Sequence, residues 1–520
     1  MSFSLDNLIA LTRAGGYVRF FHVAPSAAVD WSALLRAGVE QAEPAGDPWQ
    51  LAQILGDLFH PVAPAVQVFP TGAPPPPGRD SRQPFTADLE GGVTVRVPLA
   101  LNLGDGGGGA VPGFPAAGPP SPTDRTARLA ILAEAWPVFQ HFYPYWDAPS
   151  WDAENTDWTA ALRTALRAAA TDEDDEDDED DAAFTRTLRR FVAALHDGHG
   201  AVVHGAGLPF IPPLTWDWIE DRLAITAGPS PLRPGDVVLE IDGTPAAEAL
   251  AAAEELTSAA TPQHRRAQAL ATLAAGRPGT GIELTVQPAE GPVRTVMLRR
   301  SQPADDLVSP LDRIAEVRPG IFYLDVRRAT DEDFRIALPR LAAARGVVFD
   351  LRGHPRMSTT FLQHLTDHPL DSPHWDLPVT VRPDRQGTTW HRTRWTLQPT
   401  SPRLRSKLAF LTNGAAISYT ETLLGIVEHY QLGEIVGGPT GGTNGNALWL
   451  HLPAGYSLRW TGMRVMKHDG TRHHGVGIQP TVPVTPTLAG VRAGRDEVLE
   501  RGVAVVDQCA TTRLGPACAS

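Results

Sequence analysis

The spacing of apolar residues changes twice along this 520-residue chain, and that change limits the possible folds more than any other feature. Before about residue 205, apolar residues recur at helical spacing, whereas residues 214–300 contain short alternating runs separated by turn residues. Beyond residue 304, apolar strands alternate with helical segments. Since a single core rarely exceeds about 250–300 residues, we expect a multidomain α+β protein.

Five units are expected from these patterns. Residues 1–120 form a helical and strand region with a Pro/Gly-rich linker, and residues 121–205 form a helical region that ends in His-Asp-Gly-His. Residues 206–303 form a β module, residues 304–500 a C-terminal α/β domain, and residues 501–520 a tail.

Within the α/β domain, the elements alternate regularly. The sequence predicts strands at 320–326, 346–352 and 408–413, and helices at 334–344 and 421–430. This alternation is typical of a parallel or mixed sheet with crossover helices.

The helical regions contain a faint duplication. Segments that begin at Trp31 and Trp158 each follow an aspartate suited to an N-cap and continue with apolar residues at helical spacing. The second copy is longer by about the length of the acidic run 171–181, which we interpret as a solvated loop between two helices rather than a cation or partner site. The second copy has His199 where the first has Val62, which favours a special role for His199.

The net charge of −14 argues against a nucleic-acid partner and against binding to an anionic membrane surface. No apolar run is long enough to span a membrane. The N-terminus shows no secretory leader, so we expect a cytoplasmic protein, or a secreted or periplasmic one if a leader has been removed. Cys509 and Cys518 have no zinc-binding spacing; they are either free thiols or a terminal disulfide, and no cofactor is expected. The oligomeric state is left open.

Ser418 is the most notable candidate nucleophile. It follows the predicted strand 408–413 and a run of small residues, and it precedes the predicted helix 421–430. Chemistry in open α/β sheets gathers at the carboxyl ends of strands, and helix N-termini present N–H groups that stabilise an oxyanion. A simple helix cap is the alternative role, because serine is a favoured N-cap residue.

Four stretches, in this order, resemble the C-terminal processing, or tail-specific, peptidase family (S41). They are Leu195-His-Asp-Gly-His199, the segment 232–243, the segment 346–353, and the segment 411–421 with its continuation 437–442. The resemblance implies a PDZ-like domain for the β module, a ClpP/crotonase-like fold for the catalytic domain, and a serine peptidase that acts on peptides or proteins. The PDZ-like domain would either capture a peptide or act as a spacer that gates the cleft.

The resemblance also implies roles for individual residues. Ser418 matches the family nucleophile, and the backbone N–H groups of Gly353 and Tyr419 match its oxyanion hole. One branch of the family uses a lysine near the position of Thr443 as the base, and no lysine is present here. The other, tricorn-core-like branch uses a histidine before the PDZ segment, which His199 matches. Imidazole titrates near neutral pH and suits this role.

Three departures from the family pattern stand out. Residues 354–357 read His-Pro-Arg-Met where the family has Asn-Pro-Gly-Gly, and Gly198 stands where the tricorn core has a serine. His474 occupies the position of the expected late glutamate. The orienting acid is therefore open; Glu421 is the nearest conspicuous carboxylate, although a helix-start role fits it equally.

Other function classes are weighed against the peptidase. A metallohydrolase is disfavoured because HExxH is absent, despite two histidine groups at 196–204 and 468–474. A non-catalytic ligand- or peptide-binding protein on the same fold, as in retinoid-binding relatives, would explain the altered loop 354–357. A small-substrate esterase would share the acyl chemistry.

Overall fold

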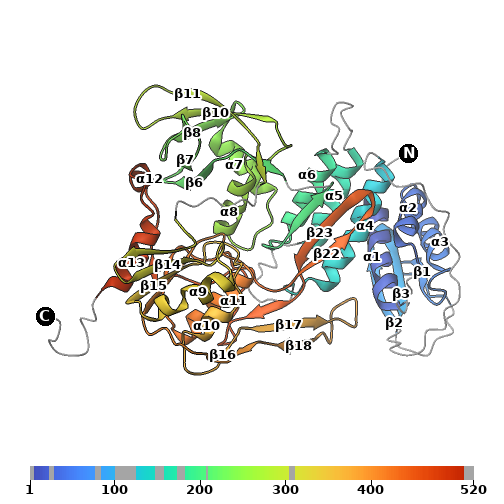
Figure 1. Cartoon of the computed structure of the whole chain (residues 1–520). Coiled ribbons are helices and arrows are strands. Elements are labelled where there is room, and N and C mark those ends of the chain that lie inside the picture. The colour runs from blue at the N-terminus through green and yellow to red at the C-terminus, as the bar shows by residue number, and fades with distance from the viewer. Residues whose placement is uncertain are drawn as a thin grey trace.

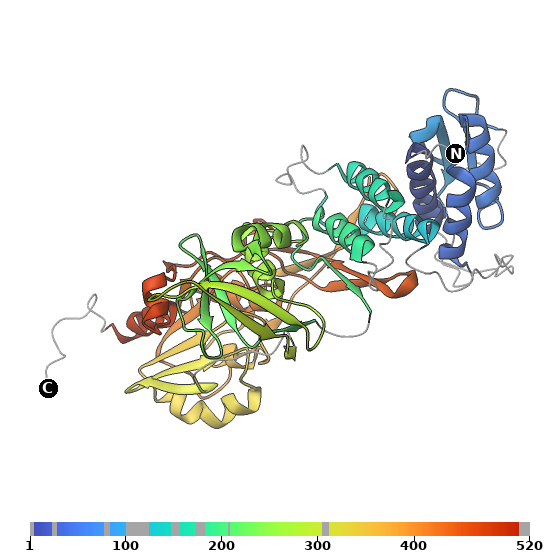
Figure 2. The ribbon, with the colours of Figure 1, turned by 90° about the horizontal axis from the view of Figure 1, so that it is seen from above.

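The computed structural model describes residues 5–22, 29–76, 84–99, 124–146, 157–171, 182–205, 209–303 and 311–508. The acidic residues 172–181 and both cysteines lie outside these ranges. No helix within them is both long and apolar enough to cross a membrane. The chain combines helical and mixed sheet units, as predicted, and the N-terminal helices and α13 lie at opposite ends of an elongated molecule (Figures 1 and 2).

The N-terminal part is mainly helical. Its helices are α1 (Leu5–Tyr17), the π-helical turn η1 (Val18–His22), α2 (Trp31–Ala42), α3 (Pro48–Phe59), α4 (Arg125–Phe142), α5 (Trp158–Thr171) and α6 (Ala182–Ala193). The expected caps are present, since the Asp30 carboxylate accepts the Ala33 N–H and the Asp157 carboxylate accepts the Ala160 N–H. The two predicted helix starts at Trp31 and Trp158 are confirmed.

A small antiparallel sheet accompanies these helices. It has the order β1-β3-β2, with β1 (Gln67–Pro70), β2 (Pro84–Leu89), the 3₁₀ turn η2 (Glu90–Gly92) and β3 (Val93–Pro98). One hydrophobic core runs through the helices and this sheet, and it includes Leu458 and Trp460 from much later in the chain. The late strand that carries these two residues therefore ties the helical part to the rest of the molecule.

The β module is an antiparallel sheet of order β11-β10-β8-β7-β6, covered by two helices. Its elements are β6 (Thr215–Ile219), β7 (Arg222–Ala227), β8 (Val237–Ile241), β9 (Thr244–Pro245), α7 (Ala246–Glu255), α8 (Pro262–Thr272), β10 (Gly281–Gln287) and β11 (Arg294–Arg299). The short strands β5 (Phe210–Ile211) and β12 (Gln302–Pro303) pair at its base. The sequence patterns did not predict α8.

The last part contains a six-stranded mixed sheet of order β13-β14-β15-β20-β21-β25. Its strands are β13 (Ile314–Arg318), β14 (Ile321–Asp325), β15 (Gly346–Asp350), β20 (Lys407–Thr412), β21 (Glu434–Gly437) and β25 (Val482–Pro483). Only the β13–β14 pair is antiparallel within this sheet. The predicted mixed sheet is confirmed, and the parallel strands end together at one edge.

Helices cover both faces of this sheet. Side chains of α9 (Asp331–Ala342), α10 (Thr360–Gln363) and α11 (Tyr419–Tyr430) join one core, whereas those of α13 (Glu497–Asp507) pack on the opposite face. The helix α12 (Leu488–Arg492) packs against β6, β7 and β8 of the β module. The strand, turn and helix that surround position 418 are thus fixed by packing on both sides of the sheet.

Additional strands lie outside this sheet, and some of them extend towards the helical part (Figure 1). They are β16 (Leu370–Asp371), β17 (His374–Val379), β18 (Thr389–Thr393), β19 (Thr396–Leu397), β22 (Ala447–His451), the 3₁₀ turn η3 (Pro453–Gly455), β23 (Tyr456–Thr461) and β24 (Arg464–Met466). β23 pairs with β22 on one side and with β4 (Ala201–His204) on the other. β4 directly follows His199, so this pairing brings the C-terminal end of β23 to the histidine.

Candidate active site

Ser418 occupies the turn between β20 and α11. Its φ of 58° and ψ of −121° are uncommon for a residue that has a side chain. Although Ser418 stands at the N-cap position of α11, its side chain makes no capping hydrogen bond. A serine on a strained strand-to-helix turn, with a hydroxyl that is not used to hold the helix, is the arrangement of nucleophiles in α/β-hydrolases.

Thr443 connects the segment of Ser418 with the segment of His199. Its carbonyl oxygen accepts the Ser418 N–H at 2.6 Å, and its hydroxyl accepts the Gly198 N–H at 3.1 Å. The Thr443 side chain is fully buried. At the place where related peptidases would carry a lysine, this chain therefore has a residue that holds the nucleophile turn and the histidine turn together.

His199 lies in the turn between α6 and β4, and only 5% of its surface is exposed. Its Nδ1 lies 2.8 Å from Oγ1 of Thr461, and its carbonyl oxygen accepts a hydrogen bond from Nε of Arg459 at 2.8 Å. Burial lowers the pKa of His199, with the charge of Asp197 opposing this shift. The imidazole is therefore neutral at neutral pH, which is the state that a general base requires.

Glu421 is fully buried in the first turn of α11. Its carboxylate accepts hydrogen bonds from the N–H groups of Gly442 and Thr443, both at 2.8 Å, and from the hydroxyl of Thr440. The Nε2 of His473 lies 3.0 Å from the same carboxylate. Glu421 thus holds the loop 440–443 below the nucleophile turn, and His199 is oriented by other groups.

Gly353 follows β15 and lies close to the start of α11. The Thr420 hydroxyl donates to the Gly353 carbonyl oxygen at 2.7 Å, which ties this loop to the first turn of the helix beside Tyr419. The Tyr419 N–H has no intrahelical acceptor, because it belongs to the first residue of α11. The Gly353 N–H donates to the carbonyl oxygen of Leu351 at 2.9 Å. Of the two expected oxyanion donors, the Gly353 N–H is therefore already bonded to a carbonyl oxygen of its own segment, whereas the Tyr419 N–H has no acceptor within α11.

Two ion pairs of Arg352, one to a buried and one to an exposed carboxylate, anchor the loop that contains Gly353. Arg352 pairs with the fully buried Asp350 at 2.7 Å and with Asp496 at 2.8 Å. Burial by itself would raise the pKa of Asp350, but the charges of Arg352 and Arg327 lower it overall. A Cβ at position 353, where φ is 139°, would come within 2.9 Å of the Arg327 side chain, so glycine is required there.

His474 is buried against aromatic side chains of the N-terminal part. Its ring stacks on Tyr145 with 3.9 Å between ring centroids, and its Nε2 lies 3.4 Å from the hydroxyl of Tyr143. Burial, together with the charge of Arg472, holds the pKa of His474 well below its usual range. A neutral imidazole in this position supplies no negative charge, so it does not replace the glutamate of related peptidases.

The N-terminal end of α8 packs against the same loops. His264 Nδ1 lies 2.9 Å from the carbonyl oxygen of Gly414, and its Nε2 lies 3.4 Å from the carbonyl oxygen of Gly198. The Gln263 side chain donates to the carbonyl oxygen of Thr440 at 2.7 Å. The β module thus contacts the turns that carry both Ser418 and His199.

A pocket of about 270 Å³ opens beside Ser418. It is lined by Trp375, Thr393, Trp395, Ser418, Tyr419, Thr422, Asn444, Gly445, Asn446 and Met463. The indole rings of Trp375 and Trp395 lie 4.5 Å apart between centroids and form one wall. The pocket combines an apolar wall with amide and hydroxyl groups, as ligand pockets usually do.

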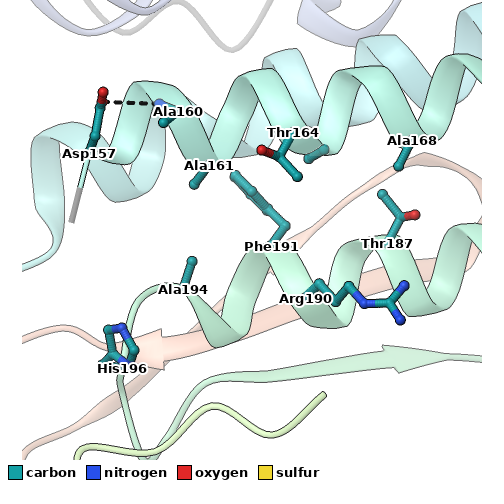
Figure 3. Close-up of a pocket in the computed structure, with 11 residues that line it drawn as sticks. Asp157, Ala160, Ala161, Thr164, Ala168, Thr187, Arg190, Phe191, Ala194 and His196 are labelled. Atoms are coloured by element: carbon teal, nitrogen blue, oxygen red, sulfur yellow. Dashed lines mark hydrogen bonds between the residues drawn. The ribbon is translucent and has the colours of Figure 1, made fainter. Parts of the chain in front are cut away.

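A second pocket, of about 430 Å³, lies between α5 and α6 (Figure 3). Small side chains line most of it, and its charged residues have structural partners. Asp157 caps α5, and Arg190 pairs with Glu255 at 2.7 Å. Among the residues that line it, the described structure contains no serine or cysteine. It offers no nucleophile comparable to Ser418.

Within the described ranges, no group of three or more His, Cys, Asp or Glu side chains is arranged to hold a metal ion. The ring of His204 stacks on Tyr456, with 4.1 Å between centroids, and its Nε2 lies 3.1 Å from the carbonyl oxygen of Ala454. Since His199 Nδ1 faces Thr461, these two histidines do not converge on a common ligand position.

Sequence reasoning missed several residues that form this site. They are Thr443, Thr461, His264, Trp375 and Trp395. Thr443 stands near the position where one branch of the family has its lysine base, so the family pattern could have drawn attention to this residue. The others carry no motif, and only the tertiary fold brings them to Ser418 or His199.

Comparisons with known proteins agree with this architecture. Residues 320–484 match the family model of Peptidase family S41, whereas no curated protein matches the chain. A crystal structure of mature CPAF has a TM-score of 0.56 at 16% identity and covers 72% of this chain and 95% of its own. Mature CPAF complexed with lactacystin gives 0.57 at 16% identity, with 72% and 97% covered. A CPAF mutant gives 0.58 at 15% identity, with 75% and 99% covered.

At these identities the likeness to CPAF shows a shared fold, and the family assignment rests on the sequence model. The matched segment contains Ser418, Gly353 and Glu421. Residues 320–484, which carry the candidate nucleophile, therefore match the serine peptidases of family S41.

Proposed function

We propose that the protein hydrolyses peptide bonds through an acyl-enzyme on Ser418, with His199 as the general base. The observation that carries this proposal is the hydroxyl of Ser418, which stands at the start of α11 in a strained turn and makes no capping bond. A pocket opens beside it, and the turn of the neutral His199 is held against the same residue, Thr443.

In the first step, Ser418 Oγ attacks the carbonyl carbon of the peptide bond while His199 Nε2 takes the hydroxyl proton. The tetrahedral oxyanion then collapses, the carbon–nitrogen bond breaks, and the imidazolium returns its proton to the leaving amine. A water molecule, deprotonated by His199, attacks the resulting ester and releases the carboxylic acid and free Ser418.

The oxyanion is stabilised by the Tyr419 N–H at the positive end of α11. The Gly353 N–H acts as the second donor when it turns from, or is shared with, the carbonyl oxygen of Leu351. Residues 354–357, which follow this second donor, read His-Pro-Arg-Met instead of the Asn-Pro-Gly-Gly of the family pattern. Failure of this donor would favour the alternative of a binding protein on the same fold.

We further propose that the β module, residues 206–303, is PDZ-like and that residues 304–500 have a ClpP/crotonase-like fold. The antiparallel sheet of the β module, with α7 and α8 packed on it, supports the first assignment. The mixed sheet with helices on both faces supports the second. Since α8 contacts the carbonyl oxygens of Gly198 and Gly414, a peptide bound to this module would lie close to the catalytic turns.

The test is labelling of the full chain with a fluorophosphonate probe. We expect labelling of the wild type, no labelling of Ser418→Ala, and labelling of His199→Ala that is about 100-fold slower or more. Ser457→Ala and His451→Ala are matched controls in β23 and β22, and both should label like the wild type. A folded wild type that never labels, or a Ser418→Ala protein that still labels, contradicts the proposal. Cleavage of small esters but of no peptide would instead indicate an esterase.

A further inference from the structure

The acidic group that orients His199 is absent from the positions where related sequences would supply it. Position 474 is a histidine stacked on Tyr145, and the Glu421 carboxylate is occupied by the loop 440–443 and His473. A buried imidazole still needs a partner that fixes its tautomer and stabilises its charged form during proton transfer. The contacts of His199 identify that partner.

Asp197 and Thr461 form a hydrogen-bonded chain that ends at His199. The Thr461 hydroxyl lies 2.6 Å from Oδ1 of Asp197 and 2.8 Å from Nδ1 of His199. All three side chains are buried, and Asp197 and Thr461 have no exposed surface. We propose that Asp197, acting through the hydroxyl of Thr461, is the acidic group that positions His199 for catalysis. This inference rests on the proposed function of Ser418 and His199.

The proton count fixes the direction of both hydrogen bonds. An ionised carboxylate only accepts, so the single proton of the Thr461 hydroxyl points to Asp197. The oxygen of Thr461 then accepts from His199, which must carry its proton on Nδ1. Nε2 is left with its lone pair, and this is the nitrogen that takes the proton of Ser418. The chain therefore selects the catalytically competent tautomer.

Further contacts hold Asp197 rigidly in this place. Its Oδ1 also accepts the backbone N–H of His199 at 3.1 Å, and its Oδ2 accepts the backbone N–H of Thr461 at 2.6 Å. Its own N–H donates to Oγ of Ser258 at 3.1 Å. The carboxylate is thus bonded to both residues that it connects, and the geometry of the chain is set before any substrate binds.

The surrounding charges make Asp197 the main stabiliser of the imidazolium. The titratable and charged groups that face His199 are Asp197, Arg459, Glu421, His264 and His474. Of these, Arg459 and the two histidines disfavour a positive charge on the His199 ring, whereas the two carboxylates favour it. Asp197 has the larger favourable effect on the pKa of His199, because it is bonded into the chain.

The decisive variants are Thr461→Val and Thr461→Ser in the full chain. Valine keeps the shape of threonine and the backbone bond to Asp197 but removes the hydroxyl; serine restores the hydroxyl. We expect Thr461→Val to label with a fluorophosphonate about 10- to 100-fold more slowly, since it loses a hydrogen bond to the charged imidazolium. Thr461→Ser should recover most of the rate. Asp197→Asn should lose at least as much, and the double variant Asp197→Asn/Thr461→Val should lose little more than either single one.

The pH dependence of labelling separates positioning from simple loss of structure. Without the hydroxyl, the imidazolium of His199 is less stable, so the acid limb of the Thr461→Val profile should shift to lower pH. A variant that is only damaged would label slowly with the limb unchanged. If Thr461→Val labels at the wild-type rate with an unchanged acid limb, and Ser418→Ala does not label, the proposed role of the hydrogen bonds from Asp197 through Thr461 to His199 is overturned and the proposed function stays intact. Labelling of Ser418→Ala would overturn the proposed function itself.

Discussion

Glu421→Gln tests whether one buried carboxylate holds the nucleophile turn in place. The carboxylate of Glu421 accepts the N–H groups of Gly442 and Thr443 and the hydroxyl of Thr440. The carbonyl oxygen of Thr443 in turn accepts the Ser418 N–H at 2.6 Å. A change at Glu421 is therefore transmitted to the backbone of Ser418 through a single residue.

The expected loss of stability follows from these bonds. Glutamine offers one oxygen and one NH₂ group, so if the oxygen keeps Thr440 and Gly442, the amide faces the Thr443 N–H. A buried donor left without an acceptor costs about 1–3 kcal/mol, and the two remaining bonds lose their charge assistance. The total is about 2–4 kcal/mol, which corresponds to a fall of about 4–16 °C in the melting temperature of a unit of this size.

Differential scanning calorimetry of the full chain measures this change, because it separates the transitions of different units. The relevant transition is the one that shifts when wild-type protein has reacted with a fluorophosphonate. Glu428→Gln is the matched control, since it changes the same residue type on the same helix. Glu428 pairs with Lys467 at 2.9 Å in a partly exposed position, so its loss should cost less than about 1 kcal/mol.

The rate of labelling provides a second readout. If loop 440–443 positions Ser418, Glu421→Gln should label at least about tenfold more slowly than Glu428→Gln, because small displacements of a nucleophile have large effects on rate. A Glu421→Gln protein that melts within about 1 °C of the wild type and labels at the wild-type rate would refute the argument. The carboxylate would then be an ordinary buried group with no influence on the nucleophile.

Two further predictions concern other parts of the molecule. Trp395→Ala removes part of the apolar wall beside Ser418. In a peptide-library assay it should lower kcat/KM by about tenfold for peptides with a large apolar side chain next to the cleaved bond. Trp390 does not line that pocket, so Trp390→Ala should have little effect in the same assay. Burial, with the charges of Arg385 and Arg13, lowers the pKa of His141 in the folded state to about 3. Between this value and the unfolded-state pKa of about 6.5, only the unfolded state binds the proton, so the free energy of unfolding falls as the pH falls. The free energy of unfolding of the wild type should therefore be lower at pH 5 than at pH 8, and His141→Gln should reduce this difference by about 2 kcal/mol. Equilibrium unfolding at the two pH values measures the difference, and an unchanged pH dependence in the variant would contradict the prediction.

The sequence predicted those elements that are encoded by local patterns. The strands expected at 346–352 and 408–413 and the helix expected at 421–430 appear as β15, β20 and α11, with ends that differ by one or two residues. Each of these elements is an apolar run, or has apolar residues at helical spacing, and packs into the same sheet. The local pattern of apolar residues is therefore sufficient to predict the element. Helix α8 was missed because few of its residues are apolar, and its first turn is held by polar contacts to loops far away in the sequence.

The site was predictable only where a motif marks it. Ser418 and His199 were singled out by their local setting and by family resemblance, but the sequence left the role of Glu421 open between helix start and catalytic acid. The structure shows its carboxylate bound to loop 440–443, a contact that depends on the path of that loop. Thr461 had no signal at all, because a threonine at the end of a strand is ordinary until the pairing of β23 with β4 places it beside His199.

Because of the same pairing, the proposed catalytic residues depend on more than the α/β domain. The segment that matches the family model, 320–484, contains Ser418 and Thr461 but lacks Asp197, His199 and α8. Thr461 ends a strand whose Leu458 and Trp460 are buried in the core of the N-terminal helices, so that core sets the position of the hydroxyl facing His199. The proposed nucleophile Ser418 thus lies in one unit, whereas the orientation of the proposed base His199 depends on another. Changes in the packing of the helical part around β23 should therefore alter the reactivity of Ser418 without touching the α/β domain.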